Sequence, residues 1–146
     1  MTTKEYLEQI EKLQLLIENK LIEVKQLKIM ACNVSAVKNS DINVQSSHEM
    51  DRLGQSIAKI VDMENSVNES MEVFINRKQT IIKQIESMED TRMYRILSAR
   101  YINFESWDRV AKITSYSPVQ VKRIHEKALA EFEKMYGKTY LSENKI

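Results

Sequence analysis

The residues best suited to chemistry lie in a short stretch near the carboxyl end of the chain. Gln120, Lys122 and Arg123 fall within the first two turns of a helix predicted over 117–136. Amide and guanidinium groups placed there can hydrogen-bond to base edges in the DNA major groove. The predicted DNA-binding residues are Ser117, Val119, Gln120, Lys122, Arg123, Lys127 and Lys112. The same pattern also fits a small helical bundle with a solvated basic face.

Few residues elsewhere suit catalysis or metal binding. The histidines, His48 and His125, lie far apart in the sequence, and Cys32 is the only cysteine. No grouping of Asp, Glu or Cys accompanies either histidine at ligand spacing, and one cysteine cannot form an intramolecular disulfide. The carboxylates fall at helix-surface spacings. The sequence therefore predicts no enzyme, no cofactor and no metal site.

Composition restricts the fold class. Among 146 residues there are only 2 Gly and 1 Pro, while 42% are hydrophobic and 29% charged. Sandwiches, barrels and phosphate-binding α/β folds need more turn residues and glycine-rich loops, and the apolar content excludes wholesale disorder. We therefore expect an all-α protein with long helices and few connections.

Charge and hydropathy predict the binding partner of the protein and its location in the cell. Residues 1–89 carry 11 basic and 14 acidic side chains, whereas residues 90–146 carry 11 basic and 7 acidic ones. The basic excess at the carboxyl end points to a polyanion such as double-stranded DNA. No apolar run is long enough for a membrane span, and the amino terminus lacks a signal-peptide core. We expect a cytoplasmic protein, in the host cytoplasm if a phage encodes it.

Two heptad patterns predict a helical hairpin over 1–89. The first helix is expected over about 3–31, where Leu21 and Ile22 widen the apolar stripe and indicate more than one neighbour. A loop is expected over 33–47, followed by a longer helix over about 48–88 with Glu64 and Lys78 as polar seam residues. Gly54 indicates a close helix approach. Because the second helix is predicted to be longer, the apolar surface of its overhang needs another partner: the C-terminal segment, a second copy of the protein, or both. A homodimer through the hairpin is expected.

Residues 90–146 are predicted to form a helix-turn-helix domain. Asp90, Ser106 and Ser117 are predicted helix N-caps, and Pro118 follows the last of them at the expected first helical position. The final helix is expected to end near Gly137. The predicted contacts between its two main helices involve Ala111, Tyr116, Val121 and Ile124, with Trp107 as a buried core anchor.

The stretch 106–129 resembles region four of bacterial primary sigma factors. The whole chain is similar to phage transcriptional regulators of the ArpU and RinA type, through residues 4–7, 44–47, 58–62, 100–103, 107 and 121–125. The resemblance implies a DNA-binding activator of late or packaging genes, with RNA polymerase as a possible partner. Thr114 and Ser115 replace the family's apolar residue and Gly, which predicts a remodelled turn. Pro118 and Val119 replace a base-reading Arg-Glu pair, so we expect no recognition of the ordinary −35 hexamer.

Two other functions fit the same sequence. One is a protein-interaction adaptor that binds RNA polymerase or another regulator and has little affinity for DNA. The other is a DNA-binding protein like the terminase small subunit. That subunit usually places its DNA-binding domain before the coiled coil, opposite to the order expected here.

Overall fold

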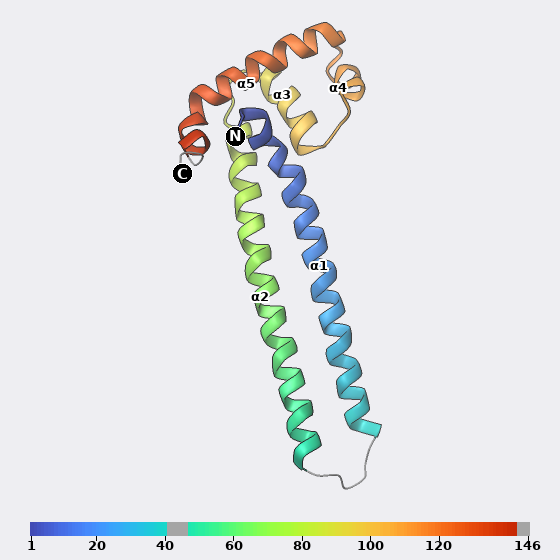
Figure 1. Cartoon of the computed structure of the whole chain (residues 1–146). Helices are drawn as coiled ribbons and strands as arrows, with labels where there is room; N and C mark the ends of the chain where they lie inside the picture. Colours follow the sequence, from blue (N-terminus) through green and yellow to red (C-terminus); the bar gives the residue numbers. More distant parts are fainter. Residues whose placement is uncertain (41–46, 143–146) are drawn as a thin grey trace. The chain divides into compact units, whose positions relative to one another are not determined.

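The computed structural model describes residues 1–40 and 47–142, and among them the side chains of residues 1–33 and 50–142. The described elements are all helical (Figure 1). The predicted all-α fold is confirmed, and the two long helices pack against each other as an antiparallel hairpin. The elements are α1 (Thr3–Ser40), α2 (Ser47–Glu86), α3 (Thr91–Leu97), the π-helix η1 (Ser98–Ile102), α4 (Trp107–Thr114) and α5 (Pro118–Leu141).

The first helix is longer than predicted. It continues through residues 33–40, where a loop was expected, while residues 41–46 of that predicted loop lie outside the described residues. Asn and Ser are weak helix formers, but no Gly or Pro interrupts this stretch. As a result α1 has 38 residues and α2 has 40. The expected difference in length, and the overhang it implied, are wrong.

Contacts within the chain define two compact units. Unit 1 combines residues 1–14 with the chain from residue 76 onward, and unit 2 comprises residues 15–75. Each unit therefore contains a part of both long helices. Unit 1 includes residues before and after residue 89, which was the predicted domain boundary. That residues 90–146 fold independently stays a prediction.

Unit 2 contains the parts of α1 and α2 that pack against each other along a narrow apolar seam. Among the side chains of unit 2 that the structure describes, the buried apolar ones are Ile17, Val24 and Leu27 of α1 and Ile60 of α2. The polar seam residue Glu64 lies 3.9 Å from Lys28 of α1, so its charge has a partner across the helix pair. A methyl group added at Gly54 would meet no atom within 4 Å, so the predicted close approach at this glycine is wrong.

Unit 1 has the larger core, built around the start of α1 and the end of α5. The ring of Tyr6 stacks on Tyr140 with centroids 4.2 Å apart, and the Tyr140 hydroxyl lies 2.9 Å from Thr3 Oγ1. Phe132 and Tyr140 are fully buried. Because Tyr140 packs in this core, α5 continues to Leu141, and the predicted helix end near Gly137 is wrong.

The other polar seam residue is also paired. Lys78 Nζ donates a hydrogen bond to the side-chain oxygen of Gln14, and the Tyr6 hydroxyl donates to Gln84 Oε1 at 2.8 Å. Both bonds join α1 to α2 within unit 1. The polar interruptions of the heptad pattern therefore supply specific contacts between the two helices instead of unpaired buried charge.

Candidate nucleic-acid interface

The helix-turn-helix begins and turns at the predicted capping residues. The Ser106 hydroxyl accepts a hydrogen bond from the Arg109 backbone N–H at 3.3 Å and starts α4. Ser117 and Gln120 form a reciprocal capping box at the start of α5, with Pro118 at the first helical position. These caps satisfy backbone N–H groups that have no partner inside the helix. The predicted starts of both helices are confirmed.

The turn keeps a left-handed residue although it lacks glycine. Ser115 adopts φ 60° and ψ 22° and closes α4 by donating its backbone N–H to the Lys112 carbonyl. Thr114 occupies the preceding buried position, where its hydroxyl donates to the Val110 carbonyl at 2.7 Å. Because the hydroxyl has this internal acceptor, a polar residue fits at this buried position. The geometry a glycine would adopt is therefore retained, at the cost of strain at Ser115.

A small apolar core holds α4 and α5 together. Ile96 and Ala99 from the preceding helices meet Val110 and Val121 there. Ala111, Tyr116 and Ile124 pack against this cluster, as the sequence predicted. The core fixes α5 with one face inward and leaves the opposite face to solvent.

The predicted DNA-binding residues all lie on exposed surface of α4, α5 or the turn between them. Val119 is 67% exposed. Among the residues that the structure describes, no carboxylate lies within ion-pair distance of the four basic side chains. The seven exposed residues are Ser117, Val119, Gln120, Lys122, Arg123, Lys127 and Lys112, of which the last four are the basic ones. The positive charges of the three lysines and Arg123 are therefore available to an anionic partner.

Two of these residues also have a structural role. The Gln120 Oε1 atom accepts the Ser117 backbone N–H at 3.2 Å, and the Ser117 hydroxyl accepts the Gln120 backbone N–H at 3.2 Å. A bidentate contact with adenine needs both the oxygen and the nitrogen of a glutamine amide. Gln120 would have to leave the capping box to make that contact. Arg123 has no such competing bond and is the better candidate for contacting a base.

An aromatic and cationic cluster flanks the interface, and the sequence did not reveal it. The Trp107 ring lies edge-on to His125 at 4.6 Å, and the Arg100 guanidinium lies 4.7 Å from the Trp107 centroid. Tyr101 and His125 are joined by a hydrogen bond of 2.8 Å. Trp107 itself is 37% exposed, so its prediction as a buried core anchor is wrong. As the first residue of α4, it lies at the edge of the core and not within it.

Burial sets the protonation of the Tyr101–His125 pair. Burial, reinforced by the positive charges of Lys4 and Arg100, lowers the pKa of His125 to about 4. Burial also raises the pKa of Tyr101 to about 12, helped by the negative charge of Glu8. Both side chains are therefore neutral near pH 7. The Tyr101 hydroxyl and Nε2 of the neutral imidazole share one hydrogen bond, and the tautomer of the imidazole determines which of the two donates.

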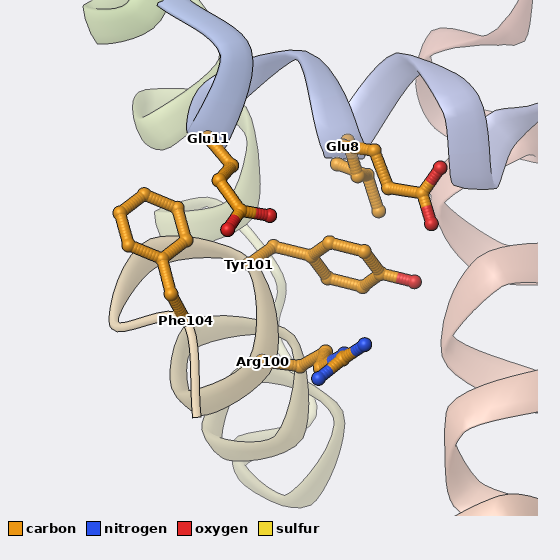
Figure 2. Close-up of a pocket in the computed structure, with 6 residues that line it drawn as sticks. Glu8, Glu11, Arg100, Tyr101 and Phe104 are labelled. Carbon is orange, nitrogen blue, oxygen red and sulfur yellow. The ribbon is translucent and has the colours of Figure 1, made fainter. Parts of the chain in front are cut away.

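Two concave surfaces each include residues of this cluster. One, of about 320 Å³, is lined by Leu7 and the residues labelled in Figure 2, where Glu8 and Glu11 of α1 face Arg100, Tyr101 and Phe104. The other, of about 370 Å³, includes the exposed part of Trp107 together with Val121, Lys122 and His125. Neither provides a metal site, since no group of three potential ligands occurs among the described residues. The second surface borders the exposed face of α5.

Comparison with known proteins gave no relatives: no family model, no curated protein and no solved structure matches this chain. Within residues 1–40 and 47–142, no helix is both long and apolar enough to cross a membrane.

Proposed function

We propose that the protein is a DNA-binding transcriptional regulator of the phage type, an activator of late or packaging genes that contacts DNA with α5. The observation that carries this proposal is the exposed, unpaired basic face at the amino-terminal half of that helix. Lys122, Arg123 and Lys127 project from a helix whose opposite face is fixed in the core. Such a helix can enter the major groove while its neighbour supports it. Homodimerisation through the hairpin and contact with RNA polymerase belong to the same proposal.

The contributions of Arg123 and Lys127 are expected to differ. Arg123 lies where a guanidinium can pair with a guanine edge, whereas Lys127 lies a turn further along and suits a phosphate. Arg123→Ala should therefore reduce binding to a selected site by about 10- to 100-fold while changing binding to random DNA much less. Lys127→Ala should weaken both and lower the salt dependence by about one unit.

Salt titrations on a selected duplex and a scrambled duplex test these expectations. Lys138→Ala is the matched control, because Lys138 is also exposed on α5 but lies near its carboxyl end. It should leave both affinities unchanged. An unchanged ratio of specific to random binding in Arg123→Ala would exclude this helix as the element that recognises the DNA sequence.

The adaptor function is the second candidate, and the exposure of Trp107 favours it. An exposed indole beside a concave surface is typical of a protein-binding site. Pull-down of fragmented host and phage DNA, with purified RNA polymerase present or absent, separates the two functions. Retention of DNA without polymerase supports direct binding, and retention only with polymerase supports the adaptor.

A further inference from the structure

Unit 2 carries an apolar stripe that the hairpin does not use. Leu15, Ile22 and Ile29 of α1 are 57%, 54% and 51% exposed, although each is a large hydrophobic residue. They recur every seven residues, and on an α-helix such positions shift by only about 20° per repeat. The three side chains therefore form one continuous row along α1, which we call the outer stripe.

The outer stripe lies opposite the buried seam of α1. The seam residues Ile17, Val24 and Leu27 face α2 and are buried. At about 100° per residue, Ile22 is rotated by roughly 180° from the mean direction of those three. The outer stripe is therefore a second apolar face and not the edge of the first. With α1 and α2 similar in length, no overhang of α2 accounts for it.

The sequence around the stripe is self-complementary when two copies run in opposite directions. Leu15 and Ile29 lie seven residues before and after Ile22, so antiparallel helices centred on Ile22 place Leu15 against Ile29 of a second copy. Glu18 and Lys25 lie along one edge of the stripe, four residues before and three after the centre. In an antiparallel pair the same edge of each helix meets, which brings Glu18 of one copy beside Lys25 of the other, twice.

A parallel pair would lose this match. Each Glu18 and Lys25 would then lie beside the opposite edge of the stripe, where Asn19 and Gln26 offer no charge. The charge pattern therefore selects one arrangement. We infer that the outer stripe of α1 is the dimerisation surface, and that it joins two copies of this chain with their α1 helices antiparallel. This inference rests on the proposed homodimer but not on DNA binding.

Substitutions at the central residue of the stripe and along its charged edge test whether this surface forms the dimer. In sedimentation equilibrium of the full chain, Ile22→Ser should weaken dimerisation by about tenfold or more, because both copies lose a central apolar contact. The matched control is Val73→Ser, since Val73 is 63% exposed on α2 but lies outside the stripe. It should leave association unchanged. Glu18→Lys should weaken the dimer by about three- to tenfold, and the double variant Glu18→Lys with Lys25→Glu should restore it.

Cysteine cross-linking tests the direction of the helices. Cys32 is exposed and lies ten residues from Ile22, so antiparallel copies would hold their two Cys32 residues about 30 Å apart. A disulfide requires Cα atoms within about 7 Å. Under mild oxidation the natural chain should therefore form no covalent dimer, whereas Ile22→Cys combined with Cys32→Ser should form one.

Three results would overturn the inference: a monomeric natural chain at tens of micromolar, a disulfide between natural Cys32 residues, or no rescue by the charge exchange. Arg123→Ala, which tests DNA recognition, should dimerise normally. A failure of the proposed DNA binding is thereby distinguished from a failure of this surface.

Discussion

The neutral, buried His125 should make the stability of the protein depend on pH. The residue is only 8% exposed, and its ring is hydrogen-bonded to the Tyr101 hydroxyl and packs in a T-shaped pair with Trp107. Burial, with Lys4 and Arg100 nearby, lowers its folded-state pKa to about 4, while Glu126 opposes this in part. In the unfolded chain a histidine has a pKa of about 6.5. Protonation therefore favours the unfolded state, and stability should fall as the pH drops from about 6.5 toward 4.

The size of the effect follows from the two pKa values. The complete shift to about 4 corresponds to roughly 3 kcal/mol at acidic pH. Between pH 7 and pH 5 the same shift gives about 1.8 kcal/mol, and solvent at the adjoining concave surface reduces this to about 1–1.5 kcal/mol. This interval lies above the range in which Asp90 titrates, because hydrogen bonds from Arg92 lower the pKa of that carboxyl.

Urea unfolding at pH 7 and pH 5 measures the difference in free energy. The fluorescence of Trp107 is a suitable signal, because it is the only tryptophan and contacts His125. The control is His125→Gln, which does not titrate but retains an oxygen that can accept the Tyr101 hydroxyl. Its stability should vary less with pH. The reasoning is refuted if the natural chain is equally stable at both pH values, or if His125→Gln has the same dependence as the natural chain.

Three substitutions should change the free energy of unfolding in a direction that follows from the structure. Each is measured by chemical unfolding at neutral pH. Ser115→Gly should stabilise unit 1 by about 1 kcal/mol because glycine tolerates the left-handed φ of 60°; no gain would mean that the turn is unstrained. Gly54→Ala should stabilise unit 2 by about 1 kcal/mol, since the added methyl meets no atom within 4 Å, and a loss would indicate a close contact there. Trp107→Ala should cost only about 1–2 kcal/mol, because the indole is 37% exposed and a fully buried aromatic costs about 3–5 kcal/mol; loss of all structure in unit 1 would contradict this.

Local signals in the sequence predicted the helices and their starts well. Ser106, Ser117 and Pro118 act through backbone groups within a few residues, so their effect is visible without the fold. Heptad spacing likewise predicted the helical hairpin, because residues three and four positions apart lie on the same face of a helix. Ile10, Leu13 and Ile17, which follow this spacing on α1, are buried. Helix ends were harder to predict. Weak formers such as Asn33 do not stop a helix by themselves, and Gly137 is held in α5 by the packing of its neighbours.

Periodicity and capping were enough to predict the all-α class, the antiparallel hairpin and the exposure of Lys122, Arg123 and the other predicted DNA-binding residues. Which distant residues share an environment depends on how the helices pack, and the sequence patterns did not predict it. Tyr6 and Tyr140 lie 134 positions apart yet stack at 4.2 Å, and no local pattern encodes that contact. The same holds for the neutral state of His125, because desolvation depends on every element packed around the ring and not on its neighbours in the chain.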